Sequence, residues 1–152
     1  ADYVATVIKT YREAIDSYYE GTFTKEKINT WMEALATVYN RGFWSGYYLG
    51  QKLGEWSDNP GSNATQKKVY VGKGMHYFPK SSIAEFKIEA YDIKKGDKIL
   101  ITGPSTGAQE LILEDFFVND ATSEKATKGD SCTLKVPFRI RLSDKMYKIV
   151  EN

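Results

Sequence analysis

The stretch Ala84-Glu85-Phe86-Lys87-Ile88-Glu89-Ala90 alternates between apolar and charged side chains at every position. Successive side chains of a β-strand point to opposite faces of a sheet, so this alternation predicts a strand with one face in the core and one in water. The charged face carries Glu85 and Glu89 with Lys87 between them. We interpret these carboxylates as solvated charge rather than as a catalytic acid pair.

Five further strands are predicted around this stretch, at a spacing of roughly ten residues that is typical of all-β domains. They start near residues 69, 98, 110, 132 and 145. Lys-Gly-Asp at 95–97 and again at 128–130 predicts turns in which Gly takes a positive φ and Asp bonds to the local backbone. In the first strand, Gly72 and Gly74 predict a bulge or a close backbone approach. Six strands favour a small antiparallel β-barrel, because closure removes exposed sheet edges.

Residues 2–20 carry apolar side chains at steps of three and four, which predicts an amphipathic helix. Its stripe consists of Val4, Val7, Ile8, Tyr11, Ala14, Ile15 and Tyr18. Asp2 is the candidate N-cap and Gly21 the predicted end, because glycine readily adopts the left-handed conformation that closes a helix. A second helix is predicted over residues 25–39, with Thr24 as its N-cap. The two apolar stripes are expected to pack together as a helical hairpin.

Residues 58–66 separate these two patterns and are rich in Asn, Ser, Gly and Pro, which predicts a linker. The chain therefore divides into a helical hairpin with an aromatic loop over residues 1–57, a linker at 58–66, and a six-stranded β-barrel over residues 67–152. This order of elements predicts the α+β fold class.

Composition limits the chemistry open to this chain of 152 residues. It holds 21 basic and 20 acidic side chains, so the whole chain has no charge signature of nucleic-acid binding. Its single cysteine, Cys132, excludes a disulfide framework or a cluster built on the chain's own thiolates, and its single histidine, His76, excludes a histidine-rich metal site. We therefore expect no metal, no cofactor and no catalytic residue in this chain.

Cys132 lies on the apolar side of its predicted strand and is expected to be a buried structural thiol. His76 is expected to lie at the surface. No apolar run of about 18 residues is present, so the sequence predicts no membrane-spanning helix. We expect no membrane partner and a cytoplasmic location.

An aromatic loop follows the second helix and is the first candidate contact surface. Its large or cationic side chains are Arg41, Phe43, Trp44, Tyr47 and Tyr48. Aromatic and Arg residues are frequent at the centre of interfaces, which favours contact with a partner. The alternative is that the loop folds back and fills the gap between hairpin and barrel. Both interpretations remain open at this point.

A second candidate surface interleaves basic and aromatic residues at the start of the β region. It consists of Lys67, Lys68, Lys73, His76, Tyr77 and Lys80. Stacking on aromatic rings together with neutralisation of phosphates is a common way to hold single-stranded RNA. RNA contact is therefore a hypothesis here, and an ordinary charged surface is the simpler alternative.

Several motifs in this order resemble the C-terminal region of the collagenase-like peptidase family U32. They lie at residues 3–16, 41–50, 84–90, 95–107, 129–130 and 144–149. The resemblance implies a barrel similar to the second domain of elongation factor Tu. It also implies that a catalytic domain precedes residue 1 and is the first partner of this chain.

The resemblance gives the parent protein two alternative activities: a collagenase-like protease, or a prephenate-dependent hydroxylase of transfer-RNA uridine with an iron–sulfur cluster in its catalytic domain. None of the cluster's cysteines maps onto this chain. The expected role of the chain is a non-catalytic accessory domain that covers or binds substrate, with transfer RNA as a candidate partner. The alternatives are a purely structural lid that stabilises the catalytic domain, or part of a protease substrate cleft.

Overall fold

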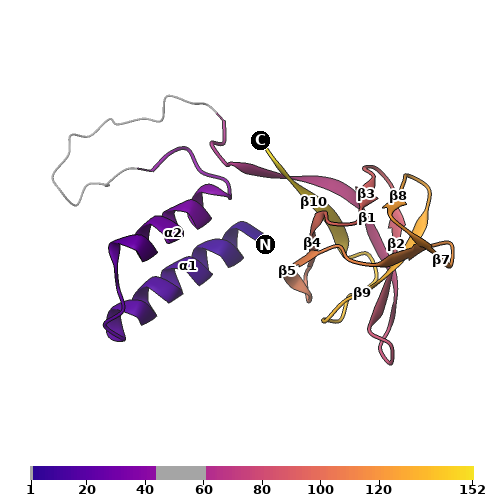
Figure 1. The fold of residues 1–152 in the computed structure, drawn as a ribbon, viewed down its shortest axis with the longest axis horizontal. Coiled ribbons are helices and arrows are strands. Elements are labelled where there is room, and N and C mark those ends of the chain that lie inside the picture. The colour runs from indigo at the N-terminus through magenta and orange to yellow at the C-terminus, as the bar shows by residue number, and fades with distance from the viewer. Residues whose placement is uncertain (1, 44–60) are drawn as a thin grey trace. The chain divides into compact units, whose positions relative to one another are not determined.

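The structure is a computed structural model that describes residues 2–43 and 61–152 (Figure 1). The chain forms two compact units. One comprises Asp2–Lys67 with Glu151–Asn152, and the other comprises Lys68–Val150. We call them the helical unit and the β unit, and we describe each by itself.

Two helices form the helical unit: α1 (Asp2–Tyr19) and α2 (Lys25–Ala36). The predicted stop after α1 is confirmed, because Gly21 has φ +68° and the next amide, Thr22 N, donates to Ser17 O at 2.9 Å. The predicted N-cap of α2 is confirmed as well, because Thr24 Oγ1 accepts from Lys27 N at 3.3 Å. The helix predicted over residues 2–20 begins at Asp2 itself.

The two helices pack on each other, but not through the predicted stripe of α1. The buried residues of α1 are Thr10 and Ser17. Most of the apolar stripe is exposed, with Ile8 63% and Tyr11 61% accessible. The expectation that both stripes pack together is therefore wrong for α1. Periodicity shows that a helix has an apolar face, but it does not show which neighbour covers that face.

Backbone bonds hold the chain after residue 61 beside the end of α2. Asn63 N donates to Asn40 O at 2.7 Å, and Thr65 N donates to Ala36 O at 3.0 Å. The last residue joins the same segment, since Asn152 N donates to Thr65 O at 2.9 Å. These bonds explain why Glu151–Asn152 belongs to the helical unit. Of the predicted linker at 58–66, residues 58–60 lie outside the described residues.

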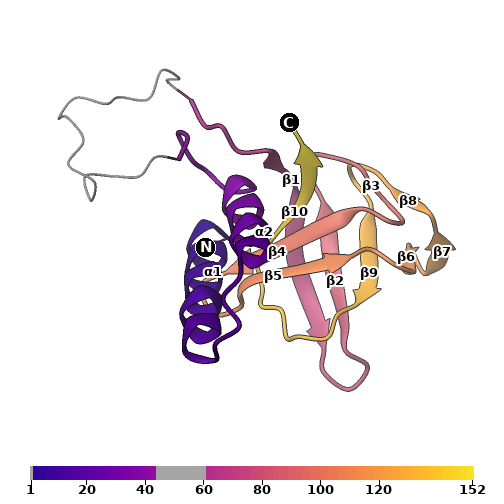
Figure 2. The ribbon, with the colours of Figure 1, turned by 60° about the vertical axis from the view of Figure 1, so that its left-hand side comes forward.

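Ten strands are described in order along the chain. They are β1 (Gln66–Phe78), β2 (Ile83–Ile88), β3 (Ile93–Lys94), β4 (Lys98–Gly103), β5 (Gly107–Ile112), β6 (Phe116–Val118), β7 (Ala121–Ser123), β8 (Lys125–Ala126), β9 (Ser131–Lys135) and β10 (Lys145–Glu151). Eight form one sheet in the order β5-β4-β10-β1-β2-β9-β6-β7, and β3 pairs with β8 (Figure 2). Every strand pair with a described register is antiparallel.

The core of the β unit lies on the inner face of this curved sheet. Its largest fully buried side chains include Phe86, Phe116, Ile99 and Met146. The alternation of β2 is confirmed, because Ala84, Phe86 and Ile88 are buried while the residues between them are partly accessible. Burying this many large apolar side chains is the main stabilising contribution to such a unit.

The two Lys-Gly-Asp turns have the predicted chemistry. Gly96 has φ +89°, and Asp97 Oδ2 accepts from the backbone N of Lys94 at 2.8 Å. Gly129 has φ +101°, and Asp130 Oδ2 accepts from the Thr127 amide at 2.7 Å. Each side chain adds a second bond to a turn that the backbone also closes, since Asp97 N donates to Lys94 O at 3.1 Å and Asp130 N donates to Thr127 O at 3.0 Å.

The bulge and the close approach predicted for β1 are both present. The register between β1 and β2 shifts between Gly74 and His76. A Cβ atom added at Gly72 would lie 1.9 Å from Lys87 O, so only glycine fits there without a backbone shift.

The predicted six-stranded closed barrel differs from the observed sheet. The stretch predicted to start at residue 110 as one strand is divided between β5 and β6, while β7 and the two-residue strands β3 and β8 were not predicted. Among the described strand pairs none joins β5 to β7, so hydrogen bonding does not close the sheet. The α+β order of two helices followed by a mostly antiparallel sheet is confirmed. The likeness to the elongation factor domain stays a prediction.

Candidate functional site

The aromatic loop is only partly described. Arg41 Nε donates to Tyr39 Oη at 3.1 Å, and Phe43 is 48% exposed. The other predicted contact residues, Trp44, Tyr47 and Tyr48, lie outside the described residues. The choice between a contact surface and a folded-back loop therefore stays a prediction.

The predicted RNA-contact residues begin with a small aromatic cluster on β1. Lys68 Nζ lies 5.3 Å from the centroid of the Tyr147 ring, within cation–π range. Tyr70 meets the same ring edge-on, with centroids 5.7 Å apart. Lys67, beside Lys68, is exposed. This end of β1 combines cationic and aromatic groups, as the sequence suggested.

The carboxylate of Glu89 offsets part of the positive charge along β1. Glu89 accepts from Tyr70 Oη at 2.5 Å and pairs with Lys73 Nζ at 2.9 Å. The bond from Tyr70, followed by that from Lys73, lowers the pKa of the Glu89 carboxyl. Burial, followed by the bond to Glu89, raises the pKa of Tyr70 to about 12. The charge of Lys73 is thus balanced within the fold.

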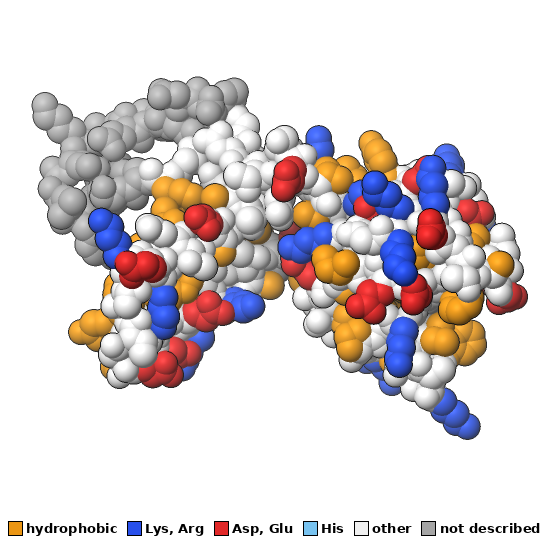
Figure 3. Space-filling view, in the orientation of Figure 1, with side chains coloured by type: hydrophobic (Ala, Val, Ile, Leu, Met, Phe, Trp, Pro, Cys, Tyr) orange, Lys and Arg blue, Asp and Glu red, His pale blue; other side chains and the backbone are white. Residues whose placement is uncertain are grey.

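The remaining predicted residues do not join this cluster. His76 is exposed and packs edge-on against Phe78, with centroids 4.4 Å apart. Tyr77 points to the other face and packs against the core. Lys80 is exposed in the turn after β1. On the face of the β unit shown in Figure 3, acidic and basic side chains are interspersed rather than gathered by sign.

The outer face of the β unit carries a groove that the sequence analysis missed. In the strand register, His76 lies opposite Glu85, Glu85 opposite Thr133, and Thr133 opposite Phe117. Because paired residues project to the same face, these four side chains cross the sheet in one row. The only sequence signal for this groove was the set of outward-facing residues in each alternating strand, and we interpreted those residues as solvated.

This groove has a volume of about 490 Å³, within the range of small-ligand sites. Its lining mixes hydroxyl, carboxylate and aromatic groups, including Phe78, Ser81, Glu85, Asp120, Ser131 and Thr133. Ser131 Oγ donates to Glu85 Oε1 at 2.7 Å, which orients the carboxylate. Phe78 and Phe117 are 43% and 44% exposed. The surface therefore offers both apolar contacts and hydrogen-bond acceptors.

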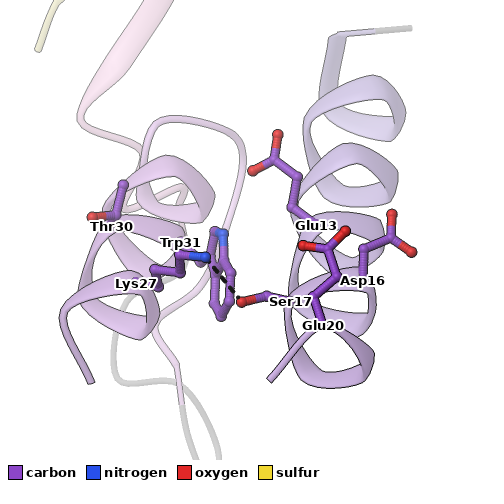
Figure 4. A pocket seen from close by; sticks show the side chains of 7 residues that line it. All are labelled: Glu13, Asp16, Ser17, Glu20, Lys27, Thr30 and Trp31. Carbon is purple, nitrogen blue, oxygen red and sulfur yellow. Dashed lines mark hydrogen bonds between the residues drawn. The ribbon is translucent and has the colours of Figure 1, made fainter. Parts of the chain in front are cut away.

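A polar pocket of 410 Å³ lies between α1 and α2. Lys27 Nζ donates to Ser17 Oγ at 3.1 Å and to Thr22 Oγ1 at 2.9 Å. Figure 4 shows Lys27 reaching from α2 towards Ser17. Ser17 is only 4% exposed, so its hydroxyl is poorly placed to attack a substrate carbonyl. We interpret these hydrogen bonds as a structural link between the end of α1 and the start of α2.

An apolar groove of 230 Å³ lies between the same helices. Its lining residues include Tyr11, Ala14, Phe23, Trp31, Met32 and Leu35. The Phe23 and Trp31 rings lie 5.4 Å apart. The groove continues the exposed apolar stripe of α1 onto α2, so the helical unit presents a broad apolar face.

Cys132 lies in the core, and the metal-ligating residue types are dispersed in the part of the chain that the structure describes. Cys132 is fully buried, as predicted; burial first, then the charges of Asp130 and Glu85, raise the pKa of its thiol to about 12. Within residues 2–43 and 61–152, no three His, Cys, Asp or Glu residues gather as a metal site. Neither α1 nor α2 has the length and hydropathy that a membrane-crossing helix needs.

Comparison with known proteins places these surfaces in a family. Residues 1–58 match the family described as Peptidase family U32. A protein named Collagenase from Porphyromonas gingivalis is 50% identical over 147 residues, which cover 97% of this chain and 36% of the relative. The chain belongs to peptidase family U32.

More distant relatives of this U32 chain extend the same similarity. A protein of Methanocaldococcus jannaschii named Uncharacterized protease MJ0090 is 33% identical over 154 residues, covering 99% of this chain and 37% of the relative. The U32 chain thus spans 36–41% of the length of the curated relatives it matches. The family match ends at residue 58, so it contains the hairpin but not the β unit.

One solved structure, the C-terminal domain of a Geobacillus thermoleovorans protein assigned to U32, is also similar. It covers 52% of this chain and 90% of its own length, with 20% identity and a TM-score of 0.49. At this score we base no argument on the likeness.

Proposed function

We propose that this chain is a non-catalytic accessory region of a U32 peptidase, in which the β unit covers or orients a polypeptide substrate. The catalytic part would lie outside these 152 residues, in the portion of the relatives that this chain does not cover. The names of the relatives, collagenase and protease, support a polypeptide as the substrate class.

The observation that carries the proposal is the outer groove of the β unit. An extended polypeptide presents apolar side chains and backbone N–H groups alternately. Phe78 in the groove and Phe117, which pairs with Thr133 of the groove in the strand register, offer exposed rings for the former. Glu85 and Thr133 offer oxygen acceptors for the latter. Substrate positioning of this kind contributes to catalysis without supplying a reacting group.

The test uses a U32 protein of the relatives' full length that carries this chain, with gelatin as substrate. Phe78→Ala combined with Phe117→Ala should raise KM by about tenfold and leave kcat unchanged. A contact that holds the substrate and the transition state equally well affects only KM when it is lost. Ile112→Ala is the matched control, because Ile112 is 57% exposed on β5 and lies outside the groove. An unchanged KM in the double variant would refute a substrate role for the groove.

Two other outcomes would select the alternatives. If deleting the β unit lowers the melting temperature of the longer protein but leaves KM unchanged, the unit is a structural lid. If the longer protein binds transfer RNA with an affinity that falls steeply with salt, and Lys68→Ala weakens that binding, the substrate is RNA. In that case the iron–sulfur cluster that the family resemblance implies would belong to the catalytic part outside this chain.

A further inference from the structure

The strongest unpaired feature of the described chain is the apolar stripe of α1. Val4, Ile8, Tyr11, Ile15 and Tyr18 recur at steps of three and four and therefore share one face of the helix. Their exposed fractions run from 49% for Ile15 to 70% for Tyr18. An amphipathic helix normally turns such a face towards a core.

The contact between α1 and α2 leaves this stripe free. The side chains of α1 that are buried at the contact, Thr10 and Ser17, are small and polar. On α2, Ile28 and Met32 are 38% and 40% exposed and line the apolar groove together with Tyr11 of the stripe. The result is one contiguous apolar face across both helices, which marks an interaction site in a soluble protein.

The side of the hairpin opposite the apolar face is polar. On that side of α1, Lys9 and Arg12 form ion pairs with Glu13 and Asp16, and Glu20 and Lys27 face each other across the polar pocket. An amphipathic helix that lies on a membrane typically carries an excess of Lys and Arg on its polar face. The balanced charge of this side therefore argues for a protein surface as the occupant of the apolar face.

The family match indicates which protein surface this is. Residues 1–58, which contain α1 and α2, match the U32 peptidase family, whereas the β unit follows the end of the match. The relatives continue this similarity in chains of which our 152 residues cover only 36–41%. In these relatives the residues that match the hairpin belong to a longer chain, which has the length to cover it.

We propose that the apolar face formed by the α1 stripe with Ile28 and Met32 docks onto an apolar surface of the U32 peptidase region outside these 152 residues. This docking fixes the hairpin to the catalytic part and makes it the anchor of the chain. The inference goes beyond the proposed function, because the anchor can exist whether or not the groove of the β unit binds substrate.

The experiment compares thiol labelling in the isolated chain and in a full-length U32 protein that carries it. Ile8→Cys and Ile15→Cys place a thiol on the stripe, and Lys9→Cys and Glu33→Cys place one on exposed positions outside it. Cys132 is fully buried and gives a low background. We expect labelling of the two stripe variants to slow by at least tenfold in the longer protein, and the controls to change by less than about twofold.

Each other result overturns the proposal. Equal labelling of the stripe variants in both proteins would show that the peptidase region does not cover the face. Slow labelling already in the isolated chain would assign the face to another part of the same chain if sedimentation shows a monomer, or to a second copy if it shows a dimer. Far-ultraviolet circular dichroism spectra of all four variants, compared with the unchanged chain, confirm that the helices form. None of these readouts depends on gelatin cleavage, so failure of the anchor and failure of the groove remain distinguishable.

Discussion

The two units of this chain differ in how far their apolar side chains are buried. In the β unit, Phe86 and Phe116 are completely buried, and the core is closed by the chain's own strands. In the helical unit, Ile8 and Tyr11 are more than half exposed, and no residue of α2 is fully buried. The β unit therefore carries its own hydrophobic stabilisation, whereas the helical unit leaves an apolar face exposed, which is the face that we propose to dock on a partner.

Cutting the chain between the units should give the largest difference. We expect residues 67–152 to fold alone, with dispersed amide resonances and a cooperative melting transition. Residues 1–66 should show partial helix content without cooperative melting, because short helices depend on tertiary packing. Circular dichroism and proton–nitrogen correlation spectra of both fragments provide the measurement. A disordered β fragment, or a helical fragment that melts cooperatively, would contradict this difference between the two units.

Removing one ring from each unit should give the next largest difference. Phe86→Ala leaves a cavity in a closed core and should lower the free energy of unfolding of the β unit by about 3–5 kcal/mol. Tyr11→Ala removes a ring that is 61% exposed and should change the stability of the helical unit by less than about 0.5 kcal/mol. Denaturant titration of the whole chain measures both. Similar losses in the two variants would contradict the contrast.

A smaller effect is expected from glycine substitutions. Gly72→Ala places a Cβ atom 1.9 Å from Lys87 O, so the backbone of β1 or β2 must move. We expect a loss of about 1–3 kcal/mol, as for other overpacked sites. Gly61→Ala is the control, because no atom lies within 4 Å of the added Cβ, and it should change stability by less than about 0.5 kcal/mol. Equal melting temperatures for the two variants would show that the backbone accommodates the added Cβ atom without a loss of stability.

The smallest expected effect is the response of the β unit to alkaline pH. The pKa of Tyr70 is raised to about 12 in the folded chain, while an unfolded tyrosine titrates near 10. The unfolded chain therefore loses this proton first, and stability should fall as pH rises from 10 to 12. Tyr70→Phe should reduce that slope, as measured by denaturant titration of both proteins at each pH. Cys132 contributes a decline of the same sign in every variant, so only the difference between slopes is diagnostic.

Features set by neighbouring residues could be predicted from the sequence. The cap at Thr24, the glycine at Gly21 and the Asp97 turn each depend on bonds that span five residues or fewer. The alternation of β2 also identified its buried face. Such patterns are local, so one sequence contains the information they need.

Features set by pairing between distant segments could not be predicted. The position of β10 between β4 and β1 depends on which strands meet, and strand spacing says nothing about that. Strands β3 and β8 have two residues each, too few for any alternation to be visible. The groove was missed for the same reason, because the row from His76 to Phe117 exists only in the register of four strands.

The β unit begins and ends at one place. Its first and last strands, β1 and β10, are neighbours in the sheet, and Thr65 O accepts from Asn152 N just outside them. A module whose entry and exit coincide can be acquired, lost or exchanged by a host protein without separating the residues on either side. The same geometry makes the unit suitable for circular permutation, in which Thr65 and Asn152 are joined by a short linker and new termini are opened at the β4–β5 turn. Gene fusion and domain shuffling are thus open to the β unit, whereas the proposed docking would tie the hairpin to the surface that covers it.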